Sequence, residues 1–206
     1  MGRKSLKETR QREIINVFYQ VAKKEGLENT SIAKIAKVME INPSLIIHYF
    51  QTKEELTYAL IDYILEKYLV IYRVRRDDKV SLRDSLIRVI AYLFSKKWNK
   101  LFDDGLFYSC YALTFRDKKV REKYKNLTNS LREKLAALIQ KCHDEGVIEV
   151  KHPRRTADLI FALVDGAYFY LSVADSGAAF EERIDDYKME AFRILGFEDV
   201  YNLPSP

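Results

Sequence analysis

Residues 41–56 read INPSLIIHYFQTKEEL and contain one complete short helix and the start of another. Asn42 is a favoured N-cap residue, and Pro43 suits the first helical position because its missing N–H would have no partner there. Thr52 and Glu55 have the spacing of a capping box, in which each side chain accepts a hydrogen bond from the backbone N–H of the other. The stretch therefore predicts a helix of about two turns, followed directly by a longer helix.

The short helix has an inward face and an outward face. At 3.6 residues per turn, Ile46 and Phe50 share one face, and they can pack on Ile35 and Ala36 of a short helix that precedes them. The residues that then point away are Pro43, Ser44, Ile47 and His48. Two short helices packed in this way form a helix-turn-helix, whose second helix fits the major groove of B-DNA.

The rest of the chain also reads as helix. With 7 Gly and 4 Pro in 206 residues and no long two-residue alternation, the sequence predicts an all-α protein. The helices are expected at about residues 7–25, 31–38, 42–50, 52–75, 81–100, 104–115, 118–145, 154–175 and 180–195. The first four form a compact head and its connector.

Positive charge is concentrated at the start of the chain. Residues 1–53 hold 10 Lys and Arg against 5 Asp and Glu, a net charge of +5, and the remainder holds 25 against 25. Such a distribution is typical of a polyanion-binding module attached to a neutral body. A solvated basic surface explains the charge equally well.

The remaining features favour a cytoplasmic protein with no membrane span, no metal and no cofactor. The basic N-terminus lacks the apolar stretch of a secretory signal. The longest apolar segment, residues 159–173, includes Asp165 and is shorter than the roughly 20 residues that span a bilayer. It predicts a helix covered either by its own domain or by another subunit. Cys110 and Cys142 are expected to be reduced structural thiols, and no zinc-ligand spacing occurs.

Groups that can bind phosphate flank the short helix. The Ser31 hydroxyl and the free N–H groups of its helix start can face one phosphate, and Lys53 at the next helix start can face another. Tyr49 can donate its hydroxyl between them. The short helix is thus predicted to be a DNA-recognition helix between two phosphate-binding helix starts.

The stretch TSIAKIAKVMEINPSLIIHYFQTKEEL, preceded by REIINVFYQVAKKEG, resembles the DNA-binding domain of the TetR (tetracycline-repressor) family of bacterial transcriptional regulators. The resemblance covers about residues 9–57. It implies a helix-turn-helix DNA-binding domain at residues 1–57, with phosphate contacts from Ser31, Tyr49 and Lys53. The implied groove contacts come from Ala33, Lys34, Pro43, Ser44, Leu45 and Ile47, beside His48. Two positions depart from the family pattern: Glu40 replaces the usual turn glycine, and Ile47 replaces a frequent aromatic residue.

The outward face of the short helix favours a particular kind of DNA readout. It offers the methyl groups of Leu45 and Ile47 and lacks the bidentate Arg–guanine contact, unless Asn42 reaches a base. We therefore expect recognition of thymine methyls and DNA shape, and A/T-rich operators. The basic residues Arg3, Lys4, Lys7, Arg10 and Arg12 form either an additional DNA-binding arm or a frayed, solvated tail.

The same resemblance implies that residues 58–206 form a helical ligand-binding and dimerisation domain, whose last two helices pair with their copies. A homodimer would bind a palindromic double-stranded operator. The segment HPRRTADLIFALVDGAYFYLSV also resembles the choline-sensing (BetI-type) branch. The candidate ligand residues are Trp98, Phe102, Phe107, Tyr108, Tyr111, Asp165 and Tyr168. They form either a cage for a cationic small-molecule effector or ordinary core.

These observations favour one function over its alternatives. The preferred interpretation is a dimeric repressor that a small molecule releases from its operator. An activator of the same fold, or a regulator controlled by a protein partner, remains open. An enzyme is disfavoured because no nucleophile–base pair, Gly-rich phosphate loop or metal-ligand spacing occurs.

Overall fold

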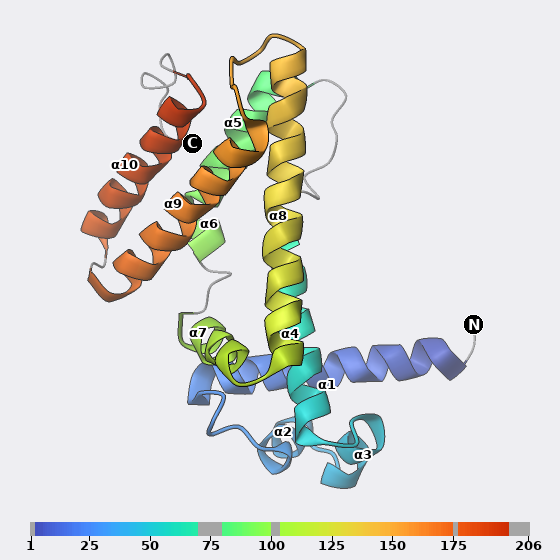
Figure 1. Cartoon of the computed structure of the whole chain (residues 1–206). Coiled ribbons are helices and arrows are strands. Elements are labelled where there is room, and N and C mark those ends of the chain that lie inside the picture. The colour runs from blue at the N-terminus through green and yellow to red at the C-terminus, as the bar shows by residue number, and fades with distance from the viewer. Residues whose placement is uncertain (1–2, 70–79, 100–103, 175–176, 198–206) are drawn as a thin grey trace. The chain divides into compact units, whose positions relative to one another are not determined.

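The computed structural model describes residues 3–69, 80–99, 104–174 and 177–197, and every regular element among them is a helix (Figure 1). This confirms the all-α prediction. The elements are α1 (Arg3–Glu25), α2 (Ile32–Met39), α3 (Pro43–Tyr49), α4 (Lys53–Tyr68), α5 (Leu82–Leu93), α6 (Lys96–Asn99), α7 (Asp104–Ala112), the 3₁₀ helix η2 (Leu113–Phe115), α8 (Lys118–Asp144), α9 (Pro153–Ala174) and α10 (Ala178–Ile194).

The helices form two compact units. The first unit contains α1 to α4, α7, η2 and the first turns of α8, up to residue 125. The second unit contains α5, α6, the remainder of α8, α9 and α10. The helix-turn-helix region therefore shares its compact unit with α4 and α7.

The core of the first unit follows the predicted inward faces. Ile14 and Phe18 of α1 are 0% and 2% exposed, and they lie in a unit where α1 packs on α2, α3 and α4. Ile46 on α3 is 0% exposed, and Phe50 directly after α3 is buried as well. Because α2 also packs on α3 and buries Ile35, the inward anchoring of the short helix is confirmed.

The first helix begins earlier than expected. The sequence predicted a helix start near Lys7, with the basic residues from Arg3 to Arg12 as a DNA-binding arm or a frayed tail, but α1 is already helical at Arg3. The physical reason is local: Arg, Lys, Glu and Gln are good helix formers, and residues 3–12 contain neither Gly nor Pro. The basic residues at the start of the chain are therefore carried on a helix.

The prediction of a single helix at residues 81–100 is wrong. The structure ends α5 at Leu93, with Phe94 buried as its C-cap, and starts the short α6 at Lys96. The Ser95 hydroxyl competes with the helical hydrogen bonds of the backbone. It donates to the Tyr92 carbonyl (2.7 Å) and accepts from the backbone N–H of Trp98 (3.2 Å). The helix expected at 104–115 likewise tightens into η2 after Ala112. Part of the helix expected at 52–75 lies outside the described residues.

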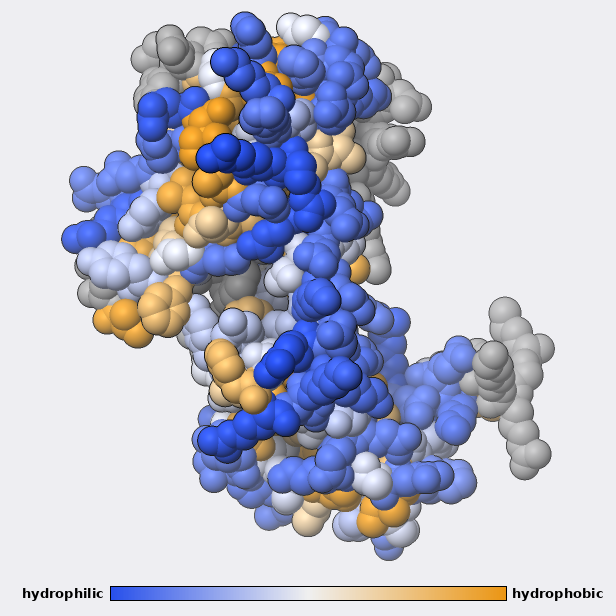
Figure 2. Space-filling model, viewed as in Figure 1, coloured by the Kyte–Doolittle hydropathy of each residue, from blue (hydrophilic) through white to orange (hydrophobic). Residues whose placement is uncertain are grey.

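The apolar helix α9 is covered by its own chain on one side. It packs on α10, and Ile160, Phe161, Val164 and Leu171 are buried. Leu159 (50% exposed), Phe169 (63%) and Val173 (79%) are not, and Figure 2 shows apolar side chains gathered along this helix. In the described part of the chain, Pro153–Val173 is the helix long and apolar enough to cross a membrane, with 44% of its most apolar window buried; core helices of soluble proteins pass the same test.

Candidate nucleic-acid interface

The turn between α2 and α3 keeps a tight geometry without glycine. Ser31 caps α2 by accepting from the Lys34 N–H (3.3 Å). At the other end, Glu40 adopts the left-handed conformation (φ 54°, ψ 41°), and its N–H binds the carbonyls of Ala36 and Lys37. This conformation costs a residue with a Cβ atom about 1 kcal/mol. The departure from the family pattern at Glu40 therefore leaves the turn intact at a modest cost in stability.

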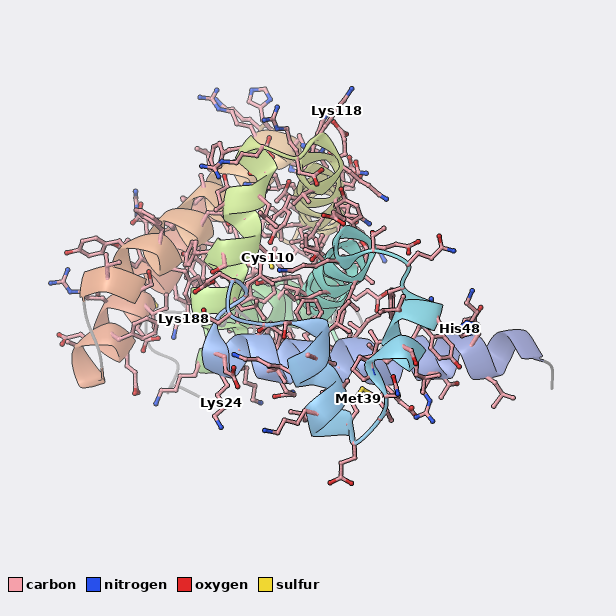
Figure 3. The ribbon with its side chains drawn as sticks, turned by 90° about the horizontal axis from the view of Figure 1, so that it is seen from below. Lys24, Met39, His48, Cys110, Lys118 and Lys188 are labelled. Atoms are coloured by element: carbon pink, nitrogen blue, oxygen red, sulfur yellow. The ribbon has the colours of Figure 1, made fainter. Side chains whose placement is uncertain are left out.

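The short helix α3 presents the expected outward face. Asn42 caps it by accepting from the Ser44 N–H at 2.9 Å, so its carbonyl oxygen is already engaged. The exposed residues of this face are Pro43, Ser44, Ile47 (50% exposed) and His48, whereas Leu45 is half-buried. Figure 3 shows α3, with His48, beside the N-terminal half of α1. A convex, partly apolar helix surface is thus available at this end of the first unit.

The start of α4 differs slightly from a capping box. Thr52 accepts from the Glu55 N–H (3.1 Å), as the sequence predicted. Glu55 accepts from the N–H of Gln51 (2.8 Å), not from that of Thr52 as expected, because its side chain reaches one residue further back. Lys53 is the first helical residue and is exposed. Lys53 thus stands at a helix start, which suits an anion, next to the carboxylates of Glu54 and Glu55 in the same turn.

A hydrogen bond that the sequence did not predict holds the end of α3. Gln11 of α1 donates from its side-chain amide to the Tyr49 carbonyl at 3.1 Å. The Tyr49 ring is half-buried and meets the His48 ring edge-on, with 5.3 Å between centroids. The bond joins residues 38 positions apart, so no local pattern could have indicated it. It fixes α1 to the helix that carries the outward face.

Lys34 is engaged within the protein. Its ammonium lies 2.6 Å from the Glu25 carboxylate at the end of α1, and its hydrogen bond and charge lower the pKa of Glu25. Both side chains are substantially exposed, so the Lys34 ammonium can easily exchange Glu25 for another anionic partner. Ala33 and Ser31 are exposed beside it. Contact between Lys34 and DNA would therefore replace an existing ion pair.

The predicted ligand residues do not converge on one described site. Trp98 and Tyr168 lie in the second unit and are 1% and 3% exposed. The Tyr168 hydroxyl donates to the Leu93 carbonyl at 2.9 Å, and burial raises the pKa of Tyr168. These two rings therefore pack as core. Phe102 lies outside the described residues.

Three of the candidate rings belong to an aromatic cluster in the first unit. Phe107 meets Tyr108 edge-on (5.3 Å between centroids), stacks on Tyr111 (6.4 Å) and contacts Tyr124 (5.9 Å). Tyr111 is 44% exposed, and Tyr108 and Phe107 are half-buried. Burial raises the pKa of the adjacent Cys110 thiol to about 12, which keeps it protonated and unreactive at neutral pH.

Asp165 is an exposed residue of α9 with a cationic partner. Its carboxylate lies 2.9 Å from the guanidinium of Arg132 on α8, and that guanidinium also lies over the Phe161 ring at 5.1 Å. The Asp165 side chain is 57% exposed in the single chain. The Asp165 carboxylate is therefore paired within the protein.

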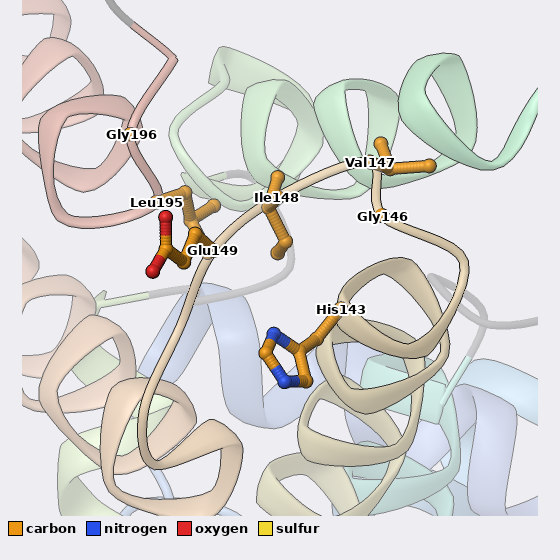
Figure 4. A pocket seen from close by; sticks show the side chains of 7 residues that line it. All are labelled: His143, Gly146, Val147, Ile148, Glu149, Leu195 and Gly196. Atoms are coloured by element: carbon orange, nitrogen blue, oxygen red, sulfur yellow. The ribbon is translucent and has the colours of Figure 1, made fainter.

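An open pocket of about 500 Å³ lies in the second unit, where the end of α8 approaches the end of α10. Figure 4 shows its lining, which is His143, Gly146, Val147, Ile148, Glu149, Leu195 and Gly196. None of the ligand residues predicted from the sequence lines this pocket.

Two family models match the chain. Residues 14–60 match the model described as "Bacterial regulatory proteins, tetR family". Residues 81–197, more than half of the chain, match the model described as "Tetracyclin repressor-like, C-terminal domain". The first match covers α2 and α3 together with the second half of α1 and the first half of α4, and the second covers α5 to α10.

Relatives and solved structures agree with these models. An HTH-type transcriptional regulator of Staphylococcus aureus strain MRSA252 is 29% identical over 142 residues, covering 60% of this chain and 76% of the relative. Another, from strain USA300, is 30% identical over 95 residues, 46% of this chain, and the match spans about half (51%) of its length.

A TetR transcription regulator of Haloarcula marismortui has the same fold, with a TM-score of 0.79, 19% identity and coverage of 92% of this chain and 97% of that one. A regulator of Saccharomonospora viridis in complex with choline gives a TM-score of 0.70 at 16% identity, covering 93% and 97%. With the helix-turn-helix geometry and both family matches, the chain belongs to the TetR family of bacterial transcriptional regulators and is a DNA-binding regulator.

Proposed function

We propose that the outward face of α3 enters the major groove, with a phosphate contact on each side of it. The observation that carries this proposal is the division of α3 into a fully buried Ile46 and an exposed Ile47. Ser31 and Lys53 stand at the starts of α2 and α4, where free backbone N–H groups favour phosphate. Tyr49 lies between them along the chain. Base edges are then met by Pro43, Ser44, Ile47 and His48, and at the margins by Ala33, Lys34 and Leu45.

The chain is proposed to act as a homodimer that pairs through α9. Five exposed residues of this helix recur at alternating spacings of three and four, namely Leu159, Ala162, Gly166, Phe169 and Val173. This is the spacing of a helix seam that packs against another helix. A second copy related by a two-fold axis would bury the same residues of both chains. Two heads in this symmetry require a palindromic operator.

The proposed dimer represses transcription in the cytoplasm, and a small-molecule effector releases it from its operator. The effector shifts the balance between DNA-bound and released states only by binding one of them more tightly. Phe107, Tyr108 and Tyr111 are the candidate ligand residues that retain accessible surface. Because the Saccharomonospora viridis regulator of similar fold was solved with choline, quaternary amines are the first compounds to test.

Selection of duplexes from a random DNA pool by the purified protein tests this function. We expect an A/T-rich palindrome with half-sites about one helical turn apart or more, because α3 offers methyl groups and few bidentate donors. Choline is then added to the selected complex, and release is measured by fluorescence anisotropy. A single, non-palindromic site with strict G/C requirements contradicts the proposed readout, and enrichment of no sequence contradicts operator binding altogether.

A further inference from the structure

The positive charge of the DNA-binding region lies almost entirely on the first turns of α1. Residues 3–12 contain five basic residues and one acidic residue, a net charge of +4. Residues 13–53 contain five basic and four acidic residues, a net charge of +1, and the rest of the chain is neutral. We call Arg3–Arg12 the α1 extension. The helix-turn-helix itself is thus only weakly basic.

The α1 extension projects beyond the packed part of its helix. Burial on α1 begins at Ile14 and continues through Phe18 and Val21, whereas Leu6 is 72% exposed and Lys7 and Arg10 are exposed. In Figures 1 and 3 the N-terminal end of α1 extends past α3. An exposed, charged helix of this kind is available to a partner.

The register of α1 decides which side of the extension faces the DNA-binding surface. At about 100° per residue, Lys7 and Arg10 lie within about 40° of Ile14, which faces the core of the first unit, while Arg12 lies about 160° away. Gln11, one turn after Lys7, contacts the end of α3 through the Tyr49 carbonyl. The inward face of α1 therefore continues past the end of α3 as a basic face.

We propose that the α1 extension binds the phosphate backbone outside the half-site that α3 reads. This proposal rests on the proposed function. A polyanion matches the charge of +4, and the basic face continues the surface that carries α3. Arg10 already pairs with Glu13 at 2.6 Å, but both side chains are about half exposed, so a phosphate can replace this carboxylate. The contact adds affinity and salt dependence without adding sequence specificity.

The test compares variants on two duplexes: the selected operator trimmed to its half-sites, and the same operator with about one extra turn of DNA (~10 base pairs) on each side. Lys7→Gln with Arg10→Gln should weaken binding to the long duplex on the order of 10-fold and reduce the slope of log K against log salt by about 4, since each protomer of the proposed dimer loses two phosphate contacts. On the trimmed duplex it should match the wild type. Arg10→Gln and Arg12→Gln form a matched pair, since each removes one arginine charge from the same segment, and only Arg10→Gln should weaken binding.

Three results would overturn the inference while leaving the proposed function in place: equal losses for Arg10→Gln and Arg12→Gln, a loss that persists on the trimmed duplex, or unchanged DNA binding with lost binding to phosphatidylserine vesicles. The last result would assign the extension to an anionic membrane surface. Circular dichroism confirms that each variant is folded. Failure of the wild type to bind either duplex would overturn the proposed function itself.

Discussion

Replacing Ile46 with Ala should destabilise the first unit by about 2–5 kcal/mol and abolish operator binding at ordinary protein concentrations. Ile46 is 0% exposed and anchors α3 to the core of the first unit. Truncating its side chain leaves a cavity that the close-packed neighbours fill only in part. Urea denaturation followed by circular dichroism measures the loss of stability, and anisotropy with labelled operator measures the loss of affinity.

Ile47 provides the matched control, because it is the same residue type one position later, about 100° further around α3 and on its exposed face. It is 50% exposed, so Ile47→Ala should change the free energy of unfolding by no more than about 0.5 kcal/mol. Its operator affinity should nevertheless fall about 10-fold, through lost contact with thymine methyl groups. Equal destabilisation by the two substitutions would show that the inward and outward faces of α3 have been misassigned.

Placing a carboxylate on α9 by Phe169→Glu should convert the proposed dimer into a monomer. Phe169 is 63% exposed in the single chain and lies on the apolar seam between Gly166 and Val173. In a dimer the new charge would be buried without a partner, which costs several kcal/mol on each side of the two-fold axis. Sedimentation equilibrium gives the oligomeric state, and operator affinity should fall strongly because only one head then binds at a time.

Phe115→Glu is the control for this substitution. Phe115 is 69% exposed and belongs to the first unit, whereas α9 belongs to the second. The same change in charge at a similarly exposed aromatic residue should leave the dimer intact. If Phe115→Glu produces monomers and Phe169→Glu does not, the α9 seam is not the dimer interface.

Local chemistry explains why much of the DNA-binding region could be predicted from the sequence. The caps at Ser31 and Asn42, the proline at the start of α3 and the spacing of Ile46 and Phe50 depend on a few neighbouring residues. The break after Leu93 was missed because a hydroxyl that competes for backbone groups gives no periodic signal. The left-handed Glu40 shows that packing on both sides of a turn can impose a conformation that its residue type disfavours.

Long-range contacts set the limit of the sequence interpretation. The hydrogen bond from Gln11 to the Tyr49 carbonyl and the ion pair between Lys34 and Glu25 join different helices. In the sequence, Gln11 and Lys34 look like ordinary polar surface residues. Most of the predicted ligand residues are aromatic, but folding places Trp98 and Tyr168 in one compact unit and Phe107 and Tyr111 in the other. Aromatic content alone does not distinguish core rings from a ligand site.

The proposed contact of α3 with the groove, with Lys53 and Tyr49 holding phosphates beside it, can be tested by one measurement. The double variant Lys53→Ala with Tyr49→Phe removes an exposed ammonium and a single hydroxyl, neither of which is buried in the core. Its affinity for the selected operator should fall on the order of 10-fold or more, and its salt slope should fall by about 2, one lysine contact from each protomer of the proposed dimer, with unchanged thermal stability. Operator affinity equal to that of the wild type in a fully folded double variant would contradict the account.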